Sequence, residues 1–213
     1  MRAIVIPAVI CLCLFWPSAD CSADVDIGLS IGDDGLKSFY LAIGDHYKAP
    51  EKEIIVVRRS KIPEEEMPVV FFLARKAEVS PGVIVQLRLE GKSWWQITAH
   101  FGLNAGIYYV PVEGKPLPPY GNAYGHYKKK KKSQWGEIVL SDADIINFVN
   151  LRFISEHYGY APDEVIKMRA NGQNFVQINT QVKNKKNKSK TEKYAEDQEP
   201  AKQNKGQGKN KKK

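Results

Sequence analysis

The chain has 213 residues and a formal net charge of +8, and 43% of its residues are hydrophobic. That apolar fraction and length are enough to bury the core of an ordinary single domain. All three cysteines lie within the first 21 positions, which excludes a disulfide framework and a thiolate metal site from the rest of the chain. Stability there must come from hydrophobic packing.

The first 23 residues have the layout of a secretory signal peptide. Arg2 precedes an uncharged apolar run over residues 3–16, which is too short to cross a bilayer comfortably. Small residues predict cleavage after Ala23; the alternative is a lipoprotein acylated at Cys21, against which the adjacent Asp20 counts. We expect a periplasmic or secreted protein whose mature chain has no transmembrane span.

Residues 24–34 follow as an N-terminal extension. Within them Val25, Ile27, Leu29 and Ile31 alternate with polar residues or glycine, which predicts a short strand. A helical domain is expected over residues 35–182.

That domain contains a repeated sequence. Shifted forward by 81 positions, residues 72–97 fall on 153–178 without a gap, and a more degraded copy lies at 46–58. Self-similarity of this kind is typical of a helical building block that buries its apolar face on its neighbours. The predicted fold class is therefore mainly α, built from three related helical hairpins.

Each unit has the sequence signals of a helix, a tight turn and a second helix. Pro81 and Pro162 suit the first helical position, where the missing N–H costs nothing. Gly91 and Gly172 are placed to end these helices in the left-handed conformation. Ser80 is the candidate N-cap of the helix that Pro81 begins.

Second helices are expected two residues after each glycine. Ser93 with Gln96, and Asn174 with Gln177, have the spacing of a capping box. Apolar residues then recur at helical intervals, which predicts one buried stripe. A further helix is predicted over residues 141–158.

An insertion over residues 104–136 separates the second and third units and is rich in Tyr, Pro and Gly. Residues 107–112 and 135–140 are candidates for a minor β-ribbon. Long insertions in compact domains are often functional. The alternative is a packed surface loop held by its tyrosines, and both interpretations stay open at this point.

Three of the four histidines have a structural interpretation. His46, His100 and His157 fall near predicted helix ends, where the helix dipole favours them, and the last two precede a glycine and an apolar residue. A metal site would require two or three of them to converge, which is the less favoured interpretation. No nucleophile elbow or phosphate loop occurs, so neither catalytic residues nor a cofactor are predicted.

Arginine recurs at one place in each unit, as Arg58, Arg88 and Arg169. Stacked repeats would present these side chains as a row able to grip carboxylates or phosphates. The favoured alternative is structural, in which each stem lies over its helix pair and the guanidinium bonds a neighbouring carbonyl or acid.

The positive charge is concentrated at the C-terminus. Residues 183–213 hold 12 Lys against four acidic residues, whereas residues 24–182 balance 19 basic with 19 acidic side chains. The tail is rich in Lys, Asn, Gln and Gly, which predicts disorder. A second basic run occupies residues 128–132.

These two basic segments are the predicted anion-binding residues. Expected partners are an anionic lipid, lipopolysaccharide, an acidic polymer or nucleic acid. A purely solubilising tail is the alternative. The candidate residues are Lys128, Lys129, Lys130, Lys131, Lys132, Lys183, Lys185, Lys186, Lys188, Lys211, Lys212 and Lys213.

Two resemblances accompany these patterns. The run from Leu87 through Gly91, Ser93 and Trp94 to Ile97 resembles the helix-turn-helix of resolvase-type DNA-binding proteins, which we interpret as shared helix-turn chemistry. Residues 39–182 are similar to predicted exported bacterial proteins with repeated helical units, each running from a proline through Val-Ile to an arginine and a glycine, and with a Pro-Pro-Tyr-Gly insertion. That family implies no known activity.

The leading hypothesis is therefore an exported, non-enzymatic interaction module for an anionic envelope component. The alternative is a cytoplasmic helix-turn-helix protein that binds DNA and has no signal peptide. An enzyme that uses the tyrosine-rich insertion would be a third class, and no motif supports it.

Overall fold

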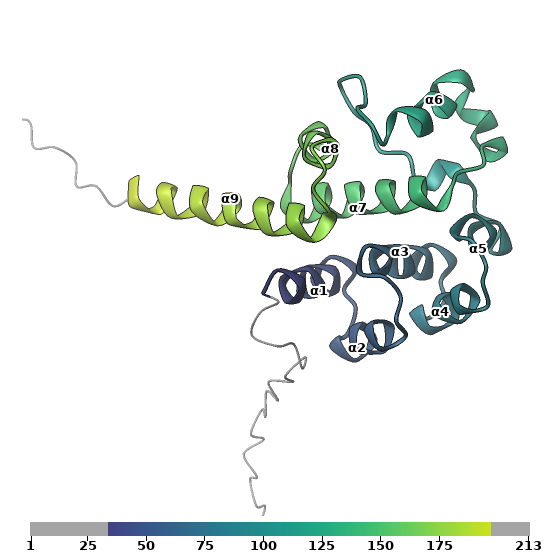
Figure 1. Cartoon of the computed structure of the whole chain (residues 1–213), viewed down its shortest axis with the longest axis horizontal. Coiled ribbons are helices and arrows are strands. Elements are labelled where there is room, and N and C mark those ends of the chain that lie inside the picture. Colours follow the sequence, from purple (N-terminus) through teal and green to yellow (C-terminus); the bar gives the residue numbers. More distant parts are fainter. Residues whose placement is uncertain (1–33, 197–213) are drawn as a thin grey trace, which may run out of the picture.

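Residues 34–196 are the part of the chain that the computed structural model describes, and every regular element within them is helical (Figure 1). This confirms the predicted mainly α class. In chain order the elements are α1 (Asp34–Tyr47), α2 (Glu51–Arg59), the 3-10 helix η1 (Glu64–Glu66), α3 (Met67–Ala77), α4 (Pro81–Leu89), α5 (Trp94–His100), η2 (Ala105–Ile107), α6 (Gly121–Lys129), η3 (Lys132–Glu137), α7 (Asp142–Tyr158), α8 (Pro162–Ala170) and α9 (Phe175–Glu196).

The repeat extends further than the sequence indicated. Shifting α4 by 81 positions reproduces the bounds of α8, and the helices before and after them, α3 with α7 and α5 with α9, correspond as well. Each of these two units is therefore built from three helices instead of two. The upstream copy is the pair α1 and α2, joined by a turn in which Lys48 takes the left-handed conformation at φ 54°.

Local signals position these helices as expected, with one exception. Gly91 and Gly172 both have φ of 86°, a conformation that favours glycine. The capping boxes that begin α5 and α9 are formed, with Ser93 Oγ accepting from Gln96 N at 3.1 Å and Asn174 Oδ1 accepting from Gln177 N at 2.9 Å. Ser80 occupies the N-cap position of α4, but its side chain makes no capping hydrogen bond.

The core lies between α3 and α7. Helix α3 contacts α1, α2, α4 and α7, and residues 67–74 are buried on every face of the helix. A helix that is apolar all round is stable only inside a protein, which explains why α3 sits at the centre. The first and last helices also meet, because α1 packs along α9.

The insertion folds differently from the predicted β-ribbon. Residues 107–112 and 135–140 form no strand; the segment instead contains η2, α6 and η3. Helix α6 was missed because two of its nine residues are glycine, the weakest helix former after proline. Tertiary packing compensates, since the rings of Tyr124 and Tyr127 lie 5.0 and 5.7 Å from that of Phe148 in α7.

Residue 183, the predicted start of the disordered tail, lies within α9. Helix α9 continues to Glu196, so residues 183–196 are helical. A prediction from composition considers residues 183–196 alone. In the structure they extend a helix that buried residues have already nucleated, and adding residues to an existing helix costs much less free energy than nucleating one. The proposed strand at 25–31 and residues 197–213 lie outside the described residues.

Candidate functional site

The two basic segments lie at opposite ends of the molecule. Lys128 and Lys129 end α6, and Lys130, Lys131 and Lys132 follow directly. Lys183, Lys185, Lys186 and Lys188 lie on α9 past the buried Val182, and this helix extends away from the body on the side opposite α6 (Figure 1). The structure therefore does not bring the two runs together. Lys211, Lys212 and Lys213 lie outside the described residues.

Three lysines of α9 are exposed and contact hydroxyls and aromatic rings of the body. Lys183 Nζ donates to Ser38 Oγ at 3.0 Å, and Lys185 Nζ donates to the hydroxyl of Tyr160 at 3.3 Å. Lys186 Nζ lies 5.8 Å from the centre of the Tyr158 ring. Such neighbours orient the ammonium groups without neutralising them, unlike carboxylates.

The lysine run after α6 is partly neutralised. Lys130 Nζ pairs with Glu137 Oε2 at 2.6 Å, and Lys132 Nζ lies 5.9 Å from the ring centre of Trp135. An anion that approached Lys130 would compete with this carboxylate. Lys130 is thus the member of this run that the structure pairs with a carboxylate.

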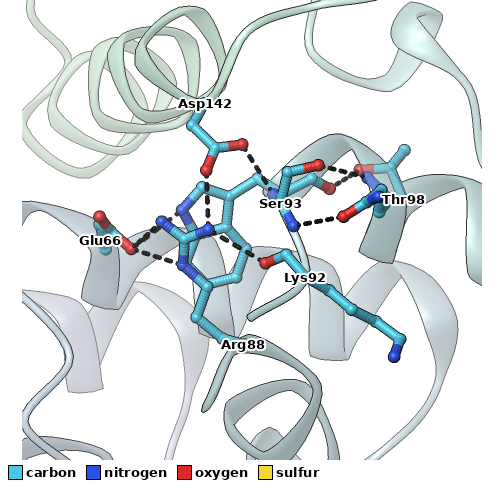
Figure 2. Close-up of polar contacts among 8 residues, drawn as sticks. Glu66, Arg88, Lys92, Ser93, Thr98 and Asp142 are labelled. Carbon is cyan, nitrogen blue, oxygen red and sulfur yellow. Dashed lines mark hydrogen bonds and ion pairs between the residues drawn. The ribbon is translucent and has the colours of Figure 1, made fainter. Parts of the chain in front are cut away.

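Arg88 is the centre of a polar cluster that joins three elements (Figure 2). Its guanidinium contacts Glu66 of η1 at 2.9 Å, Asp142 of α7 at 2.7 Å and the carbonyl oxygen of Lys92 at 3.1 Å. It also stacks over the Trp94 ring, 4.6 Å from its centre. The structural interpretation of this arginine is confirmed.

Arg169 occupies the same place in the next unit. It donates to the carbonyl oxygen of Gln173 at 3.1 Å and to Asn147 Oδ1 at 3.3 Å, and it lies 3.5 Å from Glu65. The ring of Phe175 lies 4.7 Å below it. The third arginine, Arg58, lies 5.8 Å from the centre of the Tyr40 ring. Arg88 and Arg169 therefore do not form a row of arginines available to bind an anion.

Acidic side chains from other elements also cap two helices of the repeat. Asp142 Oδ1 accepts from the backbone N–H of Trp94 at 2.8 Å, and Glu65 Oε1 accepts from that of Phe175 at 2.6 Å. These carboxylates neutralise the positive ends of α5 and α9. Sequence reasoning missed both, because the partners are 48 and 110 positions apart.

His46 and His157 meet where α1 packs on α7. Their ring centres are 6.1 Å apart, and each imidazole faces the carboxylate that precedes the other: His46 Nε2 is 3.8 Å from Glu156 and His157 Nδ1 is 3.7 Å from Asp45. Burial lowers the pKa of both imidazoles below the ordinary value of 6.5. Between residues 34 and 196, no three His, Cys, Asp or Glu side chains are placed to hold a metal ion.

The insertion also forms two cavities, which sequence reasoning did not identify. One, of about 640 Å³, is lined by the aromatic residues Tyr109, Tyr124, Tyr127 and Trp135; we call it the aromatic cleft. The other, of about 730 Å³, lies between residues 111–117 and the first turn of α8. The clustering of tyrosines in a long insertion was the only signal for them.

Compared with known proteins, the chain matches no family model, no curated protein and no solved structure. None of the helices between residues 34 and 196 is long and apolar enough to span a bilayer. Function must therefore be inferred from the chemistry of the residues themselves.

Proposed function

We propose that this protein is an exported, non-enzymatic module that captures an anionic surface or polymer through the lysines of α9 that follow Val182. The observation that carries the proposal is that α9 continues past the buried Val182 as an exposed, lysine-rich helix that extends away from the body (Figure 1). Residues 183–196 contain six lysines and two acidic residues. A helix holds the side chains of Lys183, Lys185, Lys186 and Lys188 in a defined array, so less conformational entropy is lost on binding than with a flexible tail.

The same segment supports a purely electrostatic mode of contact. From Lys183 to Lys193 the helix contains no apolar side chain. Helices that insert into the membrane interface need an apolar face as well as a basic one. We infer that α9 binds headgroups or an acidic polymer from outside and does not enter the acyl region.

Export is supported by the sequence of residues 1–23. An N-terminal sequence that starts at Asp24 in material recovered from the cell envelope or the medium is the expected result. An intact Met1 on the native protein would contradict export and favour the alternative of a DNA-binding protein.

Two observations weigh against that alternative. On α5, the helix that resembles a recognition helix, the exposed side chains are Gln96, Ala99 and His100, none of which is Lys or Arg. In addition, the carboxylate of Asp142 lies at the N-terminus of α5, where it would repel a phosphate.

The test compares two sets of substitutions in the full chain. The first changes Lys183, Lys185, Lys186 and Lys188 together to Gln, which has a similar helix propensity. The control changes residues 128–132 to Gln and removes one more positive charge. Binding is measured by cosedimentation with vesicles of equimolar phosphatidylglycerol and phosphatidylcholine, by retention on polygalacturonate, and with duplex DNA, at low and high salt.

We expect the α9 variant to lose about a hundredfold or more in affinity, because each lysine near an anionic surface contributes about 1 kcal/mol. The control should lose little, and wild-type binding should weaken steeply as salt screens the lysines. Equal affinity of the wild type and the α9 variant at both salt concentrations would sink the proposal. A loss caused only by the control would move the site to α6.

A further inference from the structure

The aromatic cleft has rigid walls. The hydroxyl of Tyr124 donates to the carbonyl oxygen of Val110 at 2.6 Å, and that of Tyr127 donates to Ala105 at 2.7 Å. The Tyr109 ring packs against both tyrosines and lies 4.6 Å from the ring of Trp135. Because these rings are held by hydrogen bonds and edge contacts, a ligand would meet a preorganised surface.

Glycine keeps one wall of the cleft open. Gly121 and Gly125 line it, one helical turn apart on α6. A Cβ atom added at Gly125 would meet no atom within 4 Å, and its backbone is not in the left-handed region, so the fold does not require glycine there. Glycine inside a helix costs about 0.5–1 kcal/mol relative to alanine. Glycine at position 125 therefore leaves space in the cleft and lowers the stability of α6 relative to alanine.

Polar groups of both signs surround the aromatic surface. Glu113, Lys115 and Lys128 line the cleft together with the rings. The segment that carries the first two is fixed, because Asp163 accepts from the backbone N–H groups of Glu113 and Gly114 at 3.1 and 3.0 Å. The buried indole N–H of Trp135 has no hydrogen-bond acceptor within the described part of the chain.

This lining discriminates between ligand classes. The lining holds one carboxylate and two ammonium groups, so a uniformly negative strand would leave Glu113 without a donor, and a purely apolar peptide would leave all three charged groups unpaired. A pyranose ring satisfies both features: its C–H face stacks on aromatic rings, and its hydroxyls both donate to a carboxylate and accept from ammonium groups. The volume of about 640 Å³ lies within the range of small-ligand sites.

We propose that the aromatic cleft is a binding site for a short neutral oligosaccharide of pyranose units. One ring stacks on Tyr109 and Trp135, and its hydroxyls reach Glu113, Lys115 and Lys128. The site is independent of the lysines on α9, which it neither contacts nor needs.

The decisive variant fills the cleft without removing any side chain. Gly125 lines the cleft and a Cβ added there meets no atom within 4 Å, so Gly125→Leu adds bulk at the wall of the cleft without a clash at Cβ. The substitution also improves helix propensity, and we expect the fold to be retained. Gly125→Ala gives a smaller block. The matched control is Gly82→Leu, at another helical glycine with open surroundings that does not line the cleft.

Isothermal titration calorimetry with cellotetraose, maltotetraose and the tetramer of N-acetylglucosamine provides the readout. We expect at least one tetramer to bind the full chain with an affinity that does not change with salt. Gly125→Leu should weaken that binding about tenfold or more, equivalent to about 1.4 kcal/mol, and Gly125→Ala less. Gly82→Leu and the α9 lysine variant should bind as the wild type does.

Two outcomes would overturn the proposal. One is that none of the three tetramers binds the wild type. The other is that Gly125→Leu, with its helical circular dichroism and melting temperature retained, binds as tightly as Gly82→Leu. Either result leaves the anion binding by α9 untouched, because that binding is measured with other probes and depends on salt.

Discussion

Arg88 and Arg169 stand 81 positions apart and make the same two local contacts. Each Nη1 donates to the carbonyl oxygen of the residue four positions later, at 3.1 Å in both units. Each guanidinium also lies over the ring of the residue six positions later, 4.6 and 4.7 Å from its centre. The arginine thus clamps the tight turn between two helices, which explains why it recurs in the repeat.

Replacing Arg88 with alanine should destabilise the fold by about 2 kcal/mol or more, because the carboxylates of Glu66 and Asp142 would lose their positively charged partner and keep only hydrogen bonds from Trp94. Glu66 is only 14% exposed, so water cannot fully replace the guanidinium. Urea unfolding measures the change. The control is Arg59→Ala on the exposed face of α2, which should stay within about 0.5 kcal/mol of the wild type. Equal effects of the two substitutions would contradict the clamp.

Changing Gly172 to valine should cost about 1 kcal/mol or more, because a β-branched residue is strained at φ of 86°. Gly91→Val should behave alike, since the geometry there is the same. The comparison is Gly82→Val within α4, where no positive φ is required. The measurement is the melting temperature by differential scanning calorimetry. Equal melting temperatures for all three variants would contradict the predicted left-handed cap.

Acidification should weaken the contact between α1 and α7. Since burial depresses the pKa of His46 and His157 below 6.5, the unfolded chain binds more protons than the folded one just below that pH. The stability that these groups contribute is therefore present above about pH 6.5 and is lost as the pH falls through their folded-state pKa values. Nearby carboxylates of Asp45 and Glu156 oppose the shift, and Arg75, Lys48 and Lys186 add to it.

The measurement is the urea midpoint between neutral pH and about pH 5. In the double variant His46→Gln with His157→Gln, the midpoint should depend less on pH than in the wild type. The same slope in both proteins would show that other groups govern the acid response.

Tyr127→Phe should cost about 1 kcal/mol, because the buried carbonyl oxygen of Ala105 loses the hydroxyl donor at 2.7 Å and keeps the backbone N–H of Tyr108 at 3.0 Å. Tyr160→Phe is the matched control, since its hydroxyl accepts from the exposed ammonium group of Lys185 at 3.3 Å. Chemical denaturation should separate the two variants. A larger loss from Tyr160→Phe would indicate that the insertion is not held by its tyrosines.

Interactions within a few residues of each other were readable from the sequence. The positive φ at Gly91 and Gly172 and the capping boxes at Ser93 and Asn174 followed from residue type and spacing. Each depends on atoms no more than a turn or two apart along the chain, so local chemistry determines the outcome almost alone.

Features that depend on residues far apart in the sequence were decided only by the tertiary structure. Glu65 reaches the N-terminus of α9 across 110 positions, and α6 forms despite two glycines because its tyrosines pack on Phe148. The helicity of residues 183–196 likewise follows from buried residues that nucleate α9 before them. The aromatic cleft and the separation of the two lysine runs are consequences of packing in three dimensions, and no short-range pattern encodes them.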